Sequence, residues 1–252
     1  MPEAVAVQDP TTRPGGVSVA DPHLSVKGLE GWYGESHVLH GIDFDVAKGE
    51  VVTLLGRNGA GKTTTLKAVM GILTKRKGSV SFEGQELIGL PARKIARAGI
   101  AFCPEERGIF STLSVEENLH LPPKVREGGL GIDQIFELFP NLKERLSSQG
   151  TKLSGGEQQM LAIARILRTG AKMLLLDEPT EGLAPVIVQQ IGQTIARLKR
   201  EGFTIVLVEQ NFRFASSVAD RHYVVEQGRV VDCIPNAELD ANIEKLHAYL
   251  GV

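Results

Sequence analysis

Short apolar stretches separated by polar turns dominate the first third of the chain. The stretches at residues 24–33 and 38–46 predict β-strands, and the unbroken apolar run at 51–55 is typical of a parallel strand that is buried on both faces. A glycine-rich loop follows that run, after which residues 63–71 predict a helix. Residues 79–86 predict a hairpin. The N-terminal part is therefore expected to be rich in β-structure.

The rest of the chain alternates helical and strand patterns. The predicted elements are a helix at 92–98, a strand at 100–103, a helix at 156–168, a strand at 173–177, a helix at 186–200, strands at 203–208, 223–226 and 229–234, and a helix at 244–250. Alternation of this kind is the signature of βαβ units and of a doubly wound, mostly parallel sheet.

Residues 104–150 interrupt this alternation with a polar, helical pattern. Two helical stretches, at 115–120 and 132–139, are separated by a Pro-Pro pair and a Gly-Gly pair. We therefore expect an inserted helical subdomain, which together with the helix that follows it spans about residues 105–168.

The composition is that of an ordinary globular protein. Of 252 residues, 42% are hydrophobic and 23% are charged, and the formal net charge is -2. This balance argues against nucleic acid as a partner, because phosphate binding needs a concentrated basic surface. The longest apolar stretches are far shorter than the roughly 20 residues that span a bilayer, so the chain is not expected to cross a membrane. One domain is predicted at 23–252, after a flexible tail at 1–22 that lacks the features of a secretory signal.

The cysteines and histidines offer little metal chemistry. Cys103 and Cys233 are far apart and lack CxxC spacing, so neither a disulfide framework nor a zinc site has support, and a reducing cytoplasm fits best. His37 and His40 lie three residues apart on a predicted strand, which places them on opposite faces and argues against a shared metal.

The loop after the apolar run at 51–55 carries a phosphate-binding pattern between a strand and a helix. Its backbone N–H groups can cradle phosphates at the positive end of the helix dipole. Lys62 is expected to reach the β and γ phosphates of ATP, and the Thr63 hydroxyl to bind Mg²⁺. The strand and helix context disfavours the alternative, a chance glycine turn. The residues expected at the nucleotide are Gly56, Asn58, Gly59, Ala60, Gly61, Lys62, Thr63 and Thr64.

A second apolar strand, at 173–177, ends in two carboxylates. Open α/β sheets bind ligands at the carboxyl ends of their strands, so Asp177 and Glu178 are expected beside the phosphates. Asp177 should hold Mg²⁺ through water, and Glu178 should act as the general base that polarises the attacking water. The phosphate-binding loop disfavours the alternative of two ordinary exposed acids.

A third motif separates this chain from kinases and GTPases. It consists of Leu153, Ser154, Gly155, Gly156, Glu157, Gln158 and Gln159. Ser154 and the glycine N–H groups form a second anion site at a helix start. This stretch resembles the signature sequence of the nucleotide-binding domains of ABC transporters, and the resemblance covers about residues 24–252.

The resemblance implies an α/β fold of the P-loop NTPase class, with a RecA-like, mostly parallel sheet, an N-terminal antiparallel β subdomain and an inserted helical subdomain. In the family, the signature of one subunit completes the ATP site of another, so Ser154, Gly155, Gly156 and Glu157 are expected at a partner's nucleotide. The chain is thus expected to form a dimer, with itself or with a second ATP-binding subunit.

Other positions match family motifs, some with departures. Tyr33 lies where the family places an aromatic ring against adenine. Glu105 aligns with the family's Mg²⁺-sensing glutamine and can still supply an oxygen ligand. Gln210 aligns with the family's switch histidine; it can donate to the γ-phosphate but cannot titrate. Ala184 replaces an aspartate found in many relatives, which puts the usual cross-dimer hydrogen bonding in doubt.

Several stretches are most similar to the second ATP-binding subunit of branched-chain amino acid importers, namely residues 104–110, 153–161, 181–185 and 208–211. This likeness implies ATP hydrolysis that drives solute uptake at the cytoplasmic face of the inner membrane. The implied partners are two transmembrane permease subunits and, indirectly, a periplasmic solute-binding protein.

Other functions remain as alternatives. One is a related urea or amide importer. Another is a soluble ABC ATPase acting on nucleic acid, although the insertion is too short for the long coiled coil of such proteins. A module that binds ATP without hydrolysing it is disfavoured by Glu178.

Overall fold

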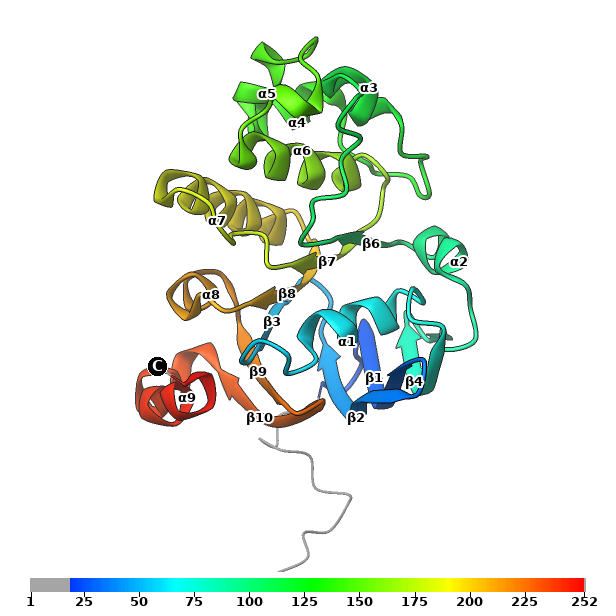
Figure 1. Ribbon diagram of the computed structural model, residues 1–252, viewed down its shortest axis with the longest axis vertical. Helices are drawn as coiled ribbons and strands as arrows, with labels where there is room; N and C mark the ends of the chain where they lie inside the picture. The colour runs from blue at the N-terminus through cyan, green and yellow to red at the C-terminus, as the bar shows by residue number, and fades with distance from the viewer. Residues whose placement is uncertain (1–18, 252) are drawn as a thin grey trace, which may run out of the picture.

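The computed structural model describes residues 19–251, which form two β-sheets with helices packed around them (Figure 1). The flexible tail predicted at residues 1–22 lies mostly outside the described residues. The α/β fold predicted from the sequence is confirmed.

The smaller sheet is antiparallel and is built from the N-terminal strands. Its order is β2 (Ser36–Val46), β1 (Leu24–Tyr33), β4 (Lys75–Phe82) and β5 (Gln85–Glu86). Leu24 and Val26 on β1 are buried while Ser25 between them is only partly so, as expected for a sheet with one covered face. The predicted strands and hairpin of this region are confirmed.

The prediction that His37 and His40 lie on opposite faces of their strand is wrong. Their rings meet edge to face, with centroids 4.2 Å apart. The pairing of β1 with β2 shifts between Gly31, which pairs with Leu39, and Trp32, which pairs with His37. One extra residue on β2 therefore forms a bulge, and a bulge reverses the alternation of faces on which the prediction relied.

The larger sheet is mostly parallel. Its order is β10 (Arg229–Pro235), β9 (Arg221–Glu226), β3 (Val51–Leu55), β8 (Thr204–Glu209), β7 (Met173–Asp177) and β6 (Ile100–Cys103). All pairs are parallel except β9 with β10. The carboxyl ends of β3, β6, β7 and β8 therefore meet at one edge of the sheet, which is where open α/β sheets bind ligands.

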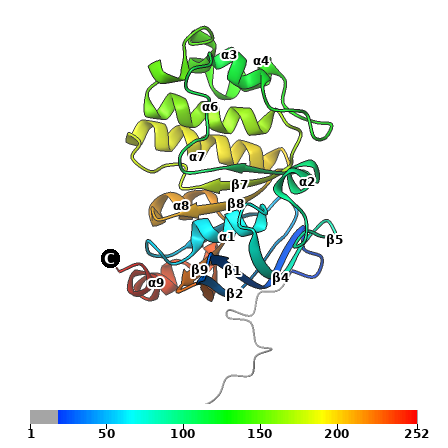
Figure 2. The same cartoon turned by 45° about the vertical axis from the view of Figure 1, so that its right-hand side comes forward.

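The helices surround the larger sheet. They are α1 (Lys62–Val69), α2 (Ala92–Arg97), α3 (Val115–His120), α4 (Ile132–Leu138), α5 (Pro140–Glu144), α6 (Gly155–Leu167), α7 (Pro185–Arg200), α8 (Phe212–Val218) and α9 (Ile243–Leu250), with short 3-10 turns at Gly150–Lys152, Asn236–Glu238 and Asp240–Asn242. Helices α3, α4, α5 and α6 gather at the end of the molecule opposite the antiparallel sheet (Figures 1 and 2). The exact subdomain limits of about 105–168 stay a prediction.

Two helices were missing from the prediction. Helix α5 is a single short turn that begins at a proline. Helix α8 begins after Asn211, whose side chain accepts a hydrogen bond from the Phe214 N–H at 3.1 Å. Asparagine is one of the residues preferred at the N-cap of a helix. The start of α8 could therefore have been predicted from Asn211 in the sequence.

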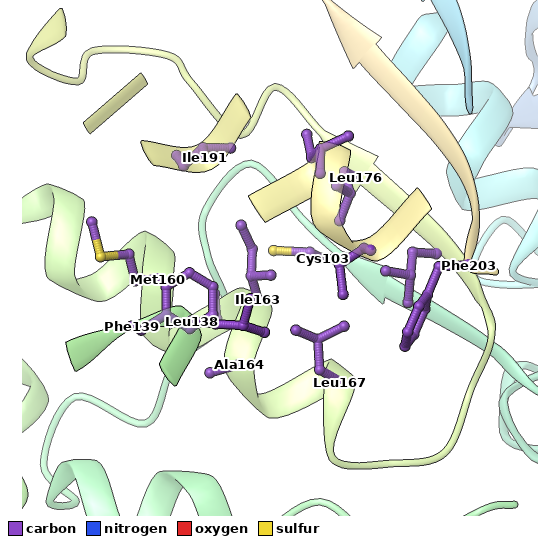
Figure 3. Packing of buried hydrophobic residues seen from close by; sticks show 14 of the residues in the cluster. Cys103, Leu138, Phe139, Met160, Ile163, Ala164, Leu167, Leu176, Ile191 and Phe203 are labelled. Carbon is purple, nitrogen blue, oxygen red and sulfur yellow. The ribbon is translucent and has the colours of Figure 1, made fainter. Parts of the chain in front are cut away.

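The central strands bury side chains on both faces. On β7, Leu174 and Leu176 join the core formed with α6 and α7, whereas Met173 and Leu175 join the core around α1. Figure 3 shows Cys103 between Leu176 and the α6 side chains Ile163 and Leu167, all of which belong to one buried core. Both cores hold β7 in place, and the position of the carboxylates at its end follows from this packing.

Candidate nucleotide site

The loop between β3 and α1 has a backbone that only glycine tolerates at several points. Gly59 and Gly61 have φ angles of 80° and 107°, in the region that favours glycine. A Cβ on Gly56 would collide with the Val225 carbonyl oxygen. Gly61 is the N-cap of α1 and supplies no side-chain cap, so the first N–H groups of the helix are left for a ligand. This geometry is an anion-binding helix start.

Lys62 folds back over this loop. Its side chain is only 4% exposed, and Nζ donates to the carbonyl oxygens of Gly56 at 2.9 Å and Arg57 at 3.2 Å. Nζ also lies 3.5 Å from Glu178 Oε1. The ammonium group is thus placed between the loop and the carboxylate at the end of β7.

Asp177 lies at the end of β7 and is buried. Its Oδ1 accepts a hydrogen bond from the Thr63 hydroxyl at 2.9 Å, and its buried Oδ2 has no hydrogen-bond partner among the described residues. Burial raises the pKa of Asp177 to about 6, and the bond from Thr63 partly opposes that rise. A carboxylate with one unpaired buried oxygen and a neighbouring hydroxyl form a pair of donors that fits Mg²⁺.

Glu178 and Gln210 form a pair at the ends of β7 and β8. Gln210 Nε2 donates to Glu178 Oε2 at 2.6 Å, and the backbone N–H of Glu178 donates to the Val208 carbonyl at 3.0 Å. Glu178 has a φ of 45°, a conformation that non-glycine residues seldom adopt and that is frequent at functional sites. From the sequence, the Gln210 side chain is expected to donate to the γ-phosphate. In the structure, its amide donates to Glu178, the candidate general base.

Most of these groups line one cavity of about 340 Å³. Its lining includes most of the sequence-predicted residues, namely Asn58, Gly59, Gly61, Lys62, Thr63, Thr64, Glu105, Glu178 and Gln210, together with Val38 and Glu181. Glu181 was not predicted. The pKa of Glu181 is raised mainly by its side-chain hydrogen bond with Glu178, and to a smaller extent by desolvation. Its position three residues after Glu178, in the same loop, was the available signal.

Several predicted residues do not line this cavity: Gly56, Ala60 and Asp177, as well as Tyr33 and the signature residues at 154–157. Tyr33, at the end of β1, is 49% exposed and free to receive a planar ring. The signature residues form the start of α6, where Ser154 Oγ accepts from the Glu157 N–H at 3.3 Å and the Ser154 N–H donates to the Glu157 carboxylate at 2.8 Å. Of the described residues at 154–157, none lines the cavity, so within one chain the signature stands apart from the phosphate-binding loop.

A phosphate-cradling loop, a lysine at the helix start and a buried acid at the end of another parallel strand of the same sheet define a P-loop nucleotide-binding protein. The family model described as "ABC transporter" matches residues 39–181. The chain belongs to the ABC transporter family as an ATP-binding component, and its enzymatic class is that of an ATPase. Among the described residues, no helix is long and apolar enough to cross a bilayer.

Individual relatives agree with this membership. The chain is 48% identical over 231 residues to the high-affinity branched-chain amino acid transport ATP-binding protein BraG of Pseudomonas aeruginosa, covering 90% of this chain and 99% of BraG. It is 37% identical over 206 residues to the probable branched-chain amino acid transport ATP-binding protein LivF of Archaeoglobus fulgidus, covering 80% of this chain and 87% of LivF. A nucleotide-free ATP-binding cassette from an ABC transporter has the same fold, with a TM-score of 0.78 and 22% identity over 92% of this chain and 99% of that one.

Proposed function

We propose that this chain is the ATP-hydrolysing subunit of an importer for branched-chain amino acids. The observation that carries the proposal is the 48% identity with BraG over nearly the full length of both chains. The sequence motifs at 104–110 and 208–211 support the same subgroup. The transported solute is chosen by other subunits, so the likeness of the ATPase is the available indicator.

The residues of the site divide the work of hydrolysis. The N–H groups of the loop at 56–61 and the Lys62 ammonium bind the phosphates. Thr63 and Asp177, with Glu105 at the cavity wall, would hold Mg²⁺, which would neutralise phosphate charge during hydrolysis. Glu178 accepts a proton from the attacking water as general base.

Phosphate binding would prepare Glu178 for this role. In the structure, Glu178 Oε1 lies 3.5 Å from Lys62 Nζ, and Oε2 accepts the amide of Gln210. When Lys62 turns to phosphate oxygens, Oε1 is released to receive the water proton. Gln210 then keeps the carboxylate oriented through its other oxygen.

A second ATP-binding subunit would complete the site. Ser154, Gly155 and Gly156 begin α6, whose free N–H groups suit the γ-phosphate bound by a partner. The partner is another copy or a related ATP-binding subunit. Two permease subunits would dock beside the helical end at the cytoplasmic face of the membrane, with a periplasmic solute-binding protein acting through them.

The test is to purify the membrane complex, identify its subunits and bound solute, and reconstitute it in proteoliposomes. Uptake of leucine, isoleucine or valine should depend on ATP and should be lost in a complex that carries Glu178→Gln. A complex that instead takes up urea, an amide or a peptide, or one with no permease, would overturn the proposed solute or the proposed role as an importer.

A further inference from the structure

Glu209 is a buried carboxylate next to Gln210, and the steps of hydrolysis described above leave it without a role. It is the last residue of β8, and 2% of it is exposed. Burying a carboxylate without hydrogen-bond partners costs folding free energy. The partners of Glu209 therefore indicate its structural role.

Both oxygens of Glu209 are used. Oε1 accepts a hydrogen bond from the Thr180 hydroxyl at 2.7 Å. Oε2 accepts the backbone N–H groups of Gln210 at 3.2 Å and Asn211 at 3.3 Å. The carboxylate thus links the loop after β7 to the loop after β8, two segments that are 29 residues apart at this contact.

These two segments carry the groups that act on water. Thr180 follows Glu178 by two residues, and Gln210 donates to Glu178 across the same gap at 2.6 Å. The Glu178 N–H donates in turn to the carbonyl of Val208, the residue before Glu209. The bonds form a closed ring in which Glu209 fixes the backbone of Gln210 relative to that of Glu178.

We propose that Glu209 is a positioning residue for ATP hydrolysis, which acts by holding Gln210 against the general base Glu178. The inference rests on the proposed hydrolysis at this site. Glu209 is buried and is not among the residues that line the cavity, so its loss should change turnover and leave nucleotide affinity nearly intact. A small displacement of catalytic groups is sufficient for a large loss of rate.

The experiment compares ATPase kinetics of the assembled complex carrying variants of both ends of the contact. Glu209→Ala should lower kcat about 10-fold or more and change KM for ATP by less than about 2-fold. Glu209→Gln should keep kcat within about 3-fold of wild type, because its carbonyl can accept the backbone N–H groups while its amide donates to the Thr180 oxygen. Thr180→Val should lower kcat and Thr180→Ser should restore it.

Thr194→Val is the matched control, because this buried hydroxyl donates to the Gln190 carbonyl at 2.9 Å within α7 and leaves the site untouched. It should retain wild-type kcat. Wild type should hydrolyse ATP and Glu178→Gln should do so at least about 10²-fold more slowly; failure of either would overturn the proposed function and with it the role of Glu209, whereas an effect missing only in the Glu209 and Thr180 variants would overturn the role of Glu209 alone.

A double variant separates positioning from a general structural role. In a Gln210→Ala background, Glu209→Ala should lower kcat by less than about 2-fold further, because both changes remove the same arrangement. A full multiplicative loss, or an unchanged kcat in the Glu209→Ala single variant, would overturn the proposal. If Glu209→Ala fails to fold, equal kcat values for Thr180→Val and Thr180→Ser would overturn it instead.

Discussion

The Lys62 ammonium is held by protein groups that phosphate oxygens would replace when ATP binds. Its ammonium donates to Gly56 and Arg57, and it lies beside Glu178. These contacts satisfy a buried cation that would otherwise be strongly unfavourable. Phosphate oxygens can accept the same ammonium hydrogens, so binding would exchange one set of contacts for another.

Lys62→Ala should therefore weaken Mg-ATP binding by roughly 10- to 100-fold, since a charge-assisted contact to two phosphates is lost. Titration calorimetry of the purified chain measures the affinity. Lys143→Ala, at an exposed lysine of α5, serves as a control and should bind like wild type. Equal affinities in the two variants would remove Lys62 from the site.

Variants of Gln210 test whether Glu178 acts as the general base while Gln210 only orients it. Because a neutral amide orients Glu178, wild-type turnover should show no rate-controlling histidine titration. Gln210→Ala should lower kcat by about 10²-fold, the order expected when one transition-state hydrogen bond is lost. Gln210→His should keep substantial activity and gain a pH dependence near 6.5, which is about the pKa of an unperturbed imidazole. ATPase rates of the assembled transporter between pH 6 and 8 decide the matter, and near wild-type turnover of the alanine form would make Gln210 a bystander.

Asp177 makes the Mg²⁺-free chain less stable as pH rises. Its pKa in the folded state is raised to about 6 from 3.8, so the folded chain binds more protons than the unfolded chain between these values. The free energy of unfolding should fall across that window, by up to about 3 kcal/mol from this group.

Asp177→Asn should remove the part of the decrease in the free energy of unfolding with pH that comes from Asp177. Urea denaturation at pH 4 and pH 7 in the presence of a chelator measures this free energy. At pH 7 the variant should be more stable than wild type without Mg²⁺, and Mg-ATP should stabilise it less. An identical pH dependence of the two proteins would contradict the raised pKa.

At the scale of elements, β7 and α6 connect the core to the site. Strand β7 is buried along its whole length and delivers Asp177 at its end, while α6 packs one side against it and presents the signature at its start. Figure 3 shows Leu176 of β7 and the α6 side chains Ile163 and Leu167 among the buried residues of this core. Damage to the contact should lower stability before it changes phosphate binding, because the phosphate-binding loop packs through Ala60 into the other core.

Ile163→Ala tests this separation. Ile163 is 1% exposed on α6, so truncation should cost about 2–5 kcal/mol in the free energy of unfolding while Mg-ATP affinity stays within about 2-fold. Val186→Ala, at a position of α7 that is 67% exposed, should be close to wild type in stability. Denaturant unfolding and calorimetry of both variants provide the comparison; a large loss of affinity in Ile163→Ala would show that the two cores are coupled.

At the scale of the whole molecule, the site and the signature lie apart in one chain, which is the arrangement expected of half a shared site. Glu178→Gln should bind ATP, hydrolyse it at least about 10²-fold more slowly, and accumulate as a closed dimer, because contacts through the γ-phosphate persist. Light scattering at saturating ATP, alone and with the related ATP-binding subunit, measures the dimer. A monomer under both conditions would contradict the shared site.

Much of the site could be predicted because its chemistry is local. Gly56, Lys62 and Thr63 belong to one loop and helix start, and Asp177 and Glu178 end one apolar strand, so spacing along the chain was sufficient. The bond from Gln210 to Glu178 and the link from Glu209 to Thr180 could not be derived this way. They depend on which strand ends become neighbours, and no local pattern reports that.

The sequence by itself determined the order of the main elements, the phosphate-binding loop, the paired carboxylates and the likeness to ABC transporters, since periodicity and motif spacing are local properties. The tertiary structure decided the order of β3, β8 and β7 in the sheet and with it the ring of bonds around Glu209. It also decided the bulge that brings His37 and His40 together. These features depend on strand pairing and register, which arise from packing between residues far apart in the chain.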